Sequence, residues 1–393
     1  MKKLIIIIFT LLFITNSPNT EQEHPVSSGS IFLSDADVSE SAGYENTELP
    51  DNIYPPPSYD ASSAPAPASP SPETPYGESS DAGTTKKTDT VILSFIGDCT
   101  IGSDESYKWN TFDQVYEKEG DPSYFFREVR HIFEADDFTF ANLEGTFTNA
   151  VKKAEKEYRF KGKPSYCEIL VQGSVEGVTL ANNHTLDYLE QGFEDTVKTL
   201  TEAGILYTYF ETYFIVDIKG IQIGFLGYKG WGHEEKSNKL LVQHVREMRE
   251  KGVDFIVANY HWGDMRSYTP NAQQRRMARF AIDNGADLVI GHHPHVIQGM
   301  EQYRGRNIVY SLGNFCYGGS PNPSDKDTII YQHILTVDTK LGEITDCSWN
   351  IIPARISSVP DRNNYQPVIA TGDDKERITR KFQKLCEELN SAD

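Results

Sequence analysis

From about residue 88 onward, short apolar runs alternate with stretches in which apolar residues recur every three or four positions. The apolar runs are rich in β-branched and aromatic residues, which is typical of buried strands, and the spaced stretches are typical of amphipathic helices. Helical spacing marks residues 123–137, 192–204, 240–252 and 272–285. Because strands that alternate with helices usually form a sheet covered by those helices, we predict a layered α/β domain.

Two further patterns add antiparallel strands to this sheet. The run YFIVDIKGIQIGFLGYKG contains Lys219-Gly220 at its centre, and residues 328–356 have a turn at Leu341-Gly342. Both are hairpin patterns, and a helical stretch follows at the C-terminal end. We therefore predict a mixed sheet arrangement, with two stacked sheets held between helices.

The first part of the chain has a different composition. Residues 1–16 contain two lysines and then an apolar run, which predicts either a cleaved secretory signal or an N-terminal membrane anchor. Residues 17–88 are rich in Pro, Ser and acidic residues, and we predict a disordered tether. After this tether we predict a folded domain at residues 89–360 and a helical tail at residues 361–393. The chain is thus expected to be exported, either to the outer face of the cell membrane or into the medium.

Charge and cysteine content exclude several classes of protein. The formal net charge is −20, and thirteen acids against two lysines between residues 17 and 90 account for about half of it. No basic stripe is present, so no nucleic-acid partner is expected. The five cysteines match no zinc-knuckle or redox spacing, and no nucleophile motif of the G-x-S-x-G type occurs.

The chemistry of the chain is concentrated where predicted strands end. The segments are FIGD, ANLEG, LANNHTLD, NYHWGD and IGHHPH, and they offer Asp, Glu, Asn and His side chains. In open α/β sheets, ligands bind at the carboxyl ends of strands. We therefore predict a metal site there, with these candidate ligands: Asp98, Glu144, Asn183, His261, His293 and His295.

Each candidate also has a purely structural alternative. Asp98 could cap the next turn, and His261 could be a buried histidine beneath Trp262. For His293 and His295, an extended tip stiffened by Pro294 would point both rings the same way and favours metal binding over two satisfied core histidines. Glu144 is suited to bridge two metals, because a carboxylate has four lone-pair directions.

The remaining polar residues suggest an acid–base pair and a substrate surface. His184 could donate a proton to a leaving group while Asp187 holds its other ring nitrogen; alternatively, Asn183 and His184 form a helix N-cap. Asn142 either contacts substrate or stabilises a turn. Arg159, Lys161 and Lys163 lie on a charged loop that either meets carboxylates or phosphates or is simply solvated.

Seven ordered motifs resemble the bacterial capsule-synthesis CapA family, also described as poly-γ-glutamate biosynthesis proteins. They are FIGD, ANLEG, YRFKGKP, LANNHTLDYLEQG, YHWGDM, GADLVIGHHPHVIQGME and NIVYSLGNF, and together they extend from about Val91 to Phe315. The resemblance implies an offshoot of the calcineurin-like metallophosphoesterases, which have a four-layer αββα sandwich and a two-metal centre.

That resemblance also implies roles for residues. Asp98 and His295 would hold one metal, Glu144 would bridge, and Asn183, His261 and His293 would hold the other, with His184 as the acid. The wider superfamily begins its site with Asp-x-His, whereas Asp98 here is followed by Cys99 and Thr100. One imidazole is therefore missing, and one or two divalent ions (Mn, Zn, Fe or Mg) are expected.

Two functions follow from the resemblance. One is a membrane-tethered factor that works with membrane-bound capsule machinery to make or export an anionic polymer such as poly-γ-glutamate. The other is a secreted, metal-dependent phosphoesterase that acts on a phosphorylated envelope component.

Overall fold

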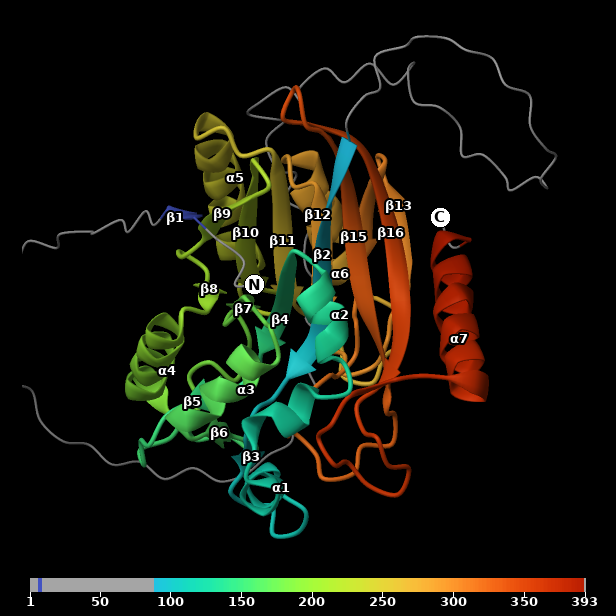
Figure 1. The fold of residues 1–393 in the computed structure, drawn as a ribbon. Helices are drawn as coiled ribbons and strands as arrows, with labels where there is room; N and C mark the ends of the chain where they lie inside the picture. The colour runs from blue at the N-terminus through green and yellow to red at the C-terminus, as the bar shows by residue number, and fades with distance from the viewer. Residues whose placement is uncertain (1–5, 9–87, 392–393) are drawn as a thin grey trace, which may run out of the picture. The chain divides into compact units, whose positions relative to one another are not determined.

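The computed structural model describes residues 6–8 and 88–391 (Figure 1). The predicted leader and tether therefore lie outside the described residues, except for Thr88 and the strand β1 (Ile6–Ile8), which pairs antiparallel with Ile215–Asp217. Within the described residues, no helix combines the length and apolarity that a membrane crossing requires.

One seven-stranded sheet, called sheet B here, is built around β2. Its order is β17-β16-β15-β2-β4-β7-β8, in which β2, β4, β7 and β8 run parallel and the C-terminal strands pair antiparallel. The strands are β2 (Thr88–Cys99), β4 (Phe138–Leu143), β7 (Gly177–Thr179), β8 (Leu206–Thr208), β15 (Asp327–Asp338), β16 (Glu343–Arg355) and β17 (Val368–Ile369).

The second sheet, sheet A, has the order β1-β9-β10-β11-β12-β14-β13. Strands β10, β11, β12 and β14 are parallel, and β9 and β13 each form a hairpin with a neighbour. The strands are β9 (Phe214–Ile218), β10 (Ile221–Lys229), β11 (Phe255–His261), β12 (Leu288–His292), β13 (Met300–Tyr303) and β14 (Arg306–Val309). In the β9–β10 turn, Lys219 and Gly220 both have positive φ, which confirms the predicted hairpin.

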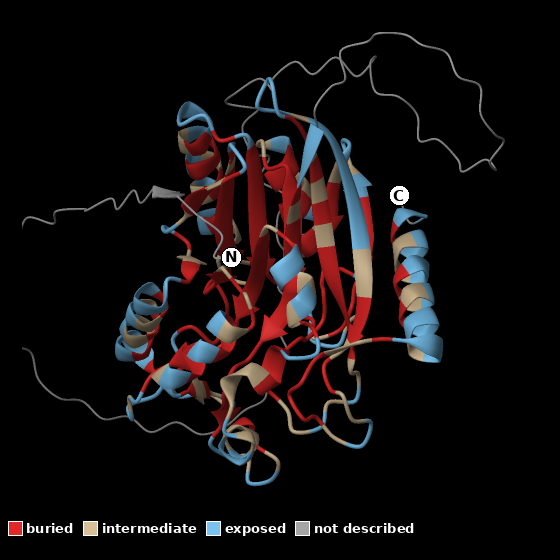
Figure 2. Cartoon of the chain, viewed as in Figure 1, coloured by how far each residue is buried: buried red, intermediate tan, exposed pale blue. Residues whose placement is uncertain are grey.

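The two sheets pack face to face, and helices cover their outer faces. The central core contains side chains of both sheets, and separate cores lie between each sheet and its helices. Figure 2 shows most strands of the two sheets as buried, whereas much of β16 and the start of β2 are exposed. Helices α2 (Arg130–Ala135), α3 (Cys167–Gln172) and α4 (Leu189–Ala203) pack on sheet B, and α5 (Glu234–Glu250) and α6 (Ala272–Asp283) pack on sheet A. The predicted four-layer αββα sandwich of mixed sheets is confirmed.

Some element predictions were wrong in detail. Residues 123–137 form a 3-10 helix, η2 (Pro122–Phe126), and then the short α2, because Tyr124, Phe125 and Phe126 are all buried and cannot share one face of an α-helix. The polar segment after residue 102 contains β3 (Ser103–Asp104) and α1 (Phe112–Glu119). Strand β3 joins β6 (Phe160–Gly162) and β5 (Thr146–Phe147) in a small third sheet.

The C-terminal region is part of the sandwich. Strand β17 adds to β16, and helix α7 begins only at Gly372, later than the expected boundary at residue 361. Ile378 and Phe382 of α7 (Gly372–Asn390) are buried in the core between the two sheets. Helix α7 thus covers a side of the sandwich, next to β13 and β16 (Figure 1).

Candidate metal centre

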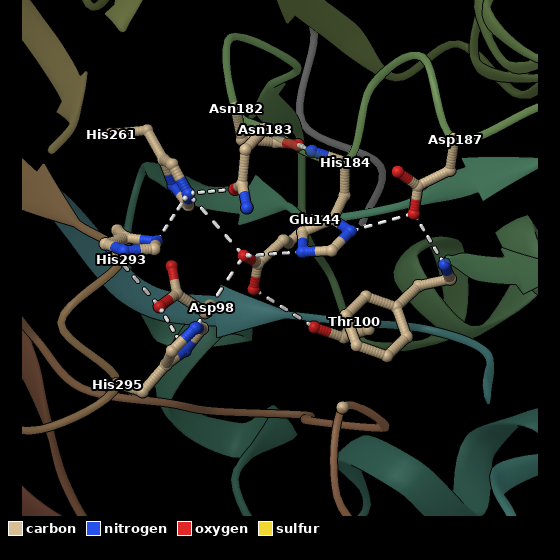
Figure 3. Close-up of polar contacts among 12 residues, drawn as sticks. Asp98, Thr100, Glu144, Asn182, Asn183, His184, Asp187, His261, His293 and His295 are labelled. Atoms are coloured by element: carbon tan, nitrogen blue, oxygen red, sulfur yellow. Dashed lines mark hydrogen bonds and ion pairs between the residues drawn. The ribbon is translucent and has the colours of Figure 1, made fainter. Parts of the chain in front are cut away.

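Four parallel strands bring their carboxyl ends together at one edge of the sandwich. Asp98 ends β2 and lies level with Asn142 of β4, while His261 ends β11 and lies level with His292 of β12. The first pair belongs to sheet B and the second to sheet A. Figure 3 shows the polar side chains from both sheets pointing toward a common centre, as the sequence pattern predicts.

Glu144 lies at the middle of this cluster and is fully buried. Its Oε2 accepts a hydrogen bond of 3.2 Å from the Thr100 hydroxyl, whereas Oε1 has no hydrogen-bond partner. Three imidazole nitrogens surround that free oxygen: Nε2 of His261 at 3.5 Å, and Nε2 of His184 and of His295 at 3.9 Å each. A buried carboxylate oxygen without a donor is costly, so this atom is suited to bind a cation.

Asp98 is held from several sides at the end of β2. Its Oδ1 accepts a 2.8 Å bond from the Asn142 amide, and its Oδ2 accepts a 3.2 Å bond from the backbone N–H of His293. The same Oδ2 is 3.2 Å from Nδ1 of His295. Asp98 therefore orients His295 and still has lone pairs that can reach a metal.

Asn142 connects the two sheets beneath the site. Its amide nitrogen contacts both Asp98 and Nδ1 of His261, the latter at 3.2 Å, and its oxygen accepts a 3.1 Å bond from Asn182. The side chain is fully buried, and all of its polar atoms have protein partners. In this arrangement Asn142 positions Asp98 and His261, instead of facing a substrate.

The outer part of the site is formed by His261, His293 and Asn183. Nε2 of His261 is 2.7 Å from Oδ1 of Asn183 and 3.1 Å from Nδ1 of His293. With Oε1 of Glu144 at 3.5 Å, four donor atoms thus lie close together. Such spacing is expected for ligands that share one small cation, and Asn183 is the exposed member of this group.

The HPH segment was predicted to be extended, and this prediction is wrong. Strand β12 ends at His292, and His293 and His295 have φ values of 96° and 58°. Both residues therefore occupy the left-handed region, which is unfavourable for side chains other than Gly and is found at functional sites. The backbone bonds to Asp98 and from Arg266 to the Pro294 carbonyl (2.7 Å) hold this bend. The two imidazole rings still lie near each other, with centroids 5.3 Å apart.

Burial and nearby charge divide the histidines into neutral and charged groups. Burial lowers the pKa of His293 to about 3, and burial together with the neighbouring imidazoles holds the pKa of His261 well below its usual value. For His295, burial opposes the charged form, but the carboxylates of Glu144 and Asp98 raise its pKa to about 9. Burial also raises the pKa of Glu144. At neutral pH His261 and His293 thus present free lone pairs to a metal.

His184 and Asp187 are in contact, as expected for the predicted acid–base pair, and Lys156 is a third member of this group. Nδ1 of His184 is 2.8 Å from Oδ2 of Asp187, which leaves Nε2 directed toward Glu144. Lys156 donates a 2.6 Å bond to the other Asp187 oxygen, and the backbone N–H of Phe160 donates a 2.6 Å bond to Oδ2. His184 is therefore fixed in orientation by a buried carboxylate that is itself held by two donors.

The charged loop reaches the site, although the three predicted substrate-binding cations do not. Arg159 bonds to carbonyls of its own loop, including that of Ala154. The ammonium of Lys161 bonds to the Ala150 carbonyl at 3.0 Å, and Lys163 pairs with a glutamate of α1 at 3.3 Å. Lys156 is the cation of this loop that lies next to His184.

The sequence pattern missed several residues that support the site. Asn182 and Asn314 hold Asn142 and His295 through side-chain contacts of 3.1 Å and 2.9 Å. The Trp231 ring lies edge-on to His293, with centroids 4.3 Å apart. His292 is buried with Nδ1 3.7 Å from Asp98, and neither ring nitrogen has a hydrogen-bond partner among the described residues. LANNHTLD contains two successive asparagines, Asn182 and Asn183. This pair was the one sequence signal that could have indicated Asn182.

The residues present fit a divalent metal. Ligand atoms of Glu144, His293 and His295 lie within 4.8 Å of one another, and the free Glu144 oxygen faces them. Imidazole and carboxylate together suit Zn, Mn or Fe, and the amide oxygen of Asn183 is compatible with these and with Mg. The candidate metal ligands named from the sequence are all brought together here: Asp98, Glu144, Asn183, His261, His293 and His295.

Fold and site together define a two-sheet sandwich with a cluster of carboxylate and imidazole side chains, a candidate metal centre, at its edge. Residues 92–318, more than half of the chain, match the family model "Bacterial capsule synthesis protein PGA_cap", and the chain belongs to this family. The resemblance inferred from the motifs is thereby confirmed.

Two relatives and one solved structure are also similar to this chain, the structure only distantly. The chain is 29% identical to the PGA biosynthesis protein CapA of Bacillus subtilis, over 66% of this chain and 72% of that protein. It is 24% identical to the capsule biosynthesis protein CapA of Bacillus anthracis, over 78% and 79% of the two chains. A phosphatase structure from Mycoplasma pneumoniae matches 68% of this chain and 95% of its own at 12% identity and a TM-score of 0.40, which is too distant to support conclusions about activity.

Proposed function

We propose that this protein acts in the synthesis or export of an anionic capsular polymer, most simply poly-γ-glutamate, through its metal centre. In this proposal it works at the outer face of the cell membrane, tethered by its N-terminal segment, next to the membrane-bound capsule machinery. Membership of the capsule synthesis family and the leader-like sequence of residues 1–16 support the proposal.

The observation that carries the proposal is the buried Oε1 of Glu144. It has no hydrogen-bond donor, and imidazoles from both sheets surround it. A core that served only stability would pair this oxygen, because an unpaired buried carboxylate destabilises the fold. The arrangement is therefore best explained by a cation that the site is built to hold.

The protein groups have distinct roles in this proposal. Asp98, Glu144 and His295 would hold one ion, and Asn183, His261, His293 and Glu144 a second. A divalent ion bound there would polarise a carbonyl or phosphoryl oxygen and would lower the pKa of a bound water. If the centre hydrolyses a phosphoester, His184, fixed by Asp187, would deliver or accept a proton at Nε2, which faces Glu144.

Metal content and polymer production test the proposal together. The full-length protein purified without chelator should contain divalent metal, and His295→Ala should lower its molar content. A capsule-forming strain that lacks its own family member should regain polymer with the wild-type gene and not with His295→Ala. His131→Ala, which removes an exposed histidine on α2, is the matched control. Unchanged metal content in His295→Ala, or full polymer production by it, would contradict the proposal.

A second function, metal-dependent phosphoester hydrolysis, is favoured by one specific observation. The paired His184 and Asp187 next to the metal ligands form an acid–base unit that simple polymer binding does not require. Turnover of a chromogenic phosphodiester with added Mn, lost in His184→Ala, would support this function. Retention of polymer production by His184→Ala would separate the two functions, because only hydrolysis depends on that proton transfer.

A further inference from the structure

A second polar cavity lies between the two sheets, at the end opposite the metal centre. It has a volume of about 300 Å³ and lies among β13, β14, β15 and β16. Asp287 and Arg306 stand at the starts of β12 and β14, whereas the metal ligands follow the end of β12. Its main polar and aromatic lining residues are Asp287, Gln302, Arg306, Asn307, His333 and Trp349. Strands β13, β15 and β16 lie near α7 in Figure 1.

A buried histidine of this cavity has an unused ring nitrogen. His333 is 4% exposed, and its Nε2 has no hydrogen-bond partner in the described part of the chain. His333 lies directly across from Trp349 in the β15–β16 ladder, so both side chains are on the face of sheet B that looks toward sheet A. The His333 ring also contacts Phe255 of sheet A, with centroids 5.1 Å apart.

A chain of hydrogen bonds favours one tautomer of His333. The Asn307 amide donates a 2.9 Å bond to the Tyr331 hydroxyl, whose oxygen lies 3.1 Å from Nδ1 of His333. The tautomer in which this hydroxyl donates to Nδ1 gives the Tyr331 proton an acceptor. Burial lowers the pKa of His333 to about 4, so the ring is neutral at pH 7. In this tautomer Nδ1 accepts a bond, so Nε2 carries the hydrogen and is a buried donor that requires an acceptor.

Arg306 is the cationic residue that lines the cavity. It lies 3.0 Å from Oδ1 of Asp287, and Arg249, outside the lining, lies 2.6 Å from Oδ2 of the same carboxylate. Two guanidinium groups thus share the Asp287 carboxylate, so Arg306 is not its only cationic partner. Trp349 is 41% exposed and adds a flat apolar surface at the rim.

We propose that this cavity binds a carboxylate carried on a short aliphatic chain, such as the side chain of glutamate. One carboxylate oxygen would accept the hydrogen of His333 Nε2, the other would face Arg306, and the methylene groups would lie against Trp349. A carboxylate suits one guanidinium and one N–H donor, because it has two oxygens and each can accept from one of these groups. The metal centre contributes no residue to this site, so the inference does not depend on the proposed function.

Calorimetric titration of the full-length protein tests the proposal. The titrations use L-glutamate and a γ-linked glutamate tripeptide in the presence of chelator, so that the metal centre cannot contribute. Arg306→Gln and His333→Phe should each weaken binding about tenfold or more, as expected for loss of a hydrogen bond to a charged group. Arg304→Gln removes the same charge from the same hairpin, but Arg304 pairs with Asp283 at 3.1 Å outside the cavity, and binding should not change.

Several results would overturn the proposal. They are the absence of measurable binding by either probe, equal affinity in Arg306→Gln and the wild type, and tighter binding of inorganic phosphate than of glutamate. If His333→Phe fails to fold, Arg306→Gln alone decides the outcome. A separate NMR measurement gives an independent answer, because the His333 Nε2–H resonance should shift on addition of glutamate and should not shift on addition of glycerol.

Discussion

Replacing Glu144 with Gln should change the stability of the metal-free protein and its affinity for metal in opposite directions. The substitution preserves shape and removes the negative charge from a buried group whose Oε1 has no donor. In the metal-free protein, a neutral amide at this position is easier to bury than a carboxylate. We therefore expect Glu144→Gln to stabilise the metal-free protein and to weaken metal binding.

The magnitude follows from the burial of this oxygen. An unsatisfied buried polar group costs about 1–3 kcal/mol, and in a domain of this size each kcal/mol changes the melting temperature by roughly 2 °C. The metal-free variant should therefore melt about 2–6 °C above the wild type at pH 7. Metal at 100 times its Kd would add about 2.7 kcal/mol of stability to the wild type, and the variant should lose most of this increase.

Differential scanning calorimetry with and without metal measures both effects. Glu301→Gln is the matched control, because Glu301 is equally buried but is paired with Arg279 at 2.8 Å and with the Tyr310 hydroxyl at 2.7 Å. The control should lose stability with or without metal.

Burial raises the pKa of Glu144 above its unfolded value, so the penalty is present only at pH values high enough to ionise the group. The difference between wild type and Glu144→Gln should therefore close below about pH 4. A metal-free variant that melts below the wild type at pH 7 would refute this reasoning.

Three further outcomes are expected. Because the pKa of His295 is raised to about 9 without metal, coordination must release a proton. Metal affinity measured by competition should therefore increase about tenfold per pH unit from pH 6 to 9. A flat profile would contradict this. Gly97→Ala should lower the free energy of unfolding by denaturant by about 3 kcal/mol or more, because a Cβ there would lie 1.9 Å from the Gly313 carbonyl oxygen. A decrease below about 1 kcal/mol would argue against this close packing. Where phosphodiester turnover is measurable, Asp187→Asn should lower kcat about 10²-fold or more with little change in KM, and unchanged kcat would exclude the His184–Asp187 pair from proton transfer.

The sequence was sufficient to predict where the site lies. Asp98, Glu144 and His261 each follow a continuous apolar strand, and strand alternation alone places such residues at one edge of a sheet. The four-layer packing could also be predicted, because the helical stretches between strands are apolar on one side only.

The details that depend on distant contacts could not be predicted. The bend at His293 is held by Asp98, which is 195 residues away, and no local pattern indicates positive φ at two histidines. Lys156 reaches Asp187 from a loop in which Arg159, Lys161 and Lys163 are equally charged. Only the folded loop determines which cation faces the site.

The position of β15 between β2 and β16 has a consequence for how the chain acquires its structure. Strand β2 begins the folded region, yet its antiparallel neighbour arrives much later, since Ser94 and Gln332 are in contact across 238 residues of sequence. Until that strand has been synthesised, β2 presents an unpaired edge with exposed N–H and C=O groups, and such edges promote aggregation. Contacts of this separation also slow folding. Truncation of the last 70 or so residues should therefore yield insoluble protein, even though all six candidate metal ligands are encoded before that point.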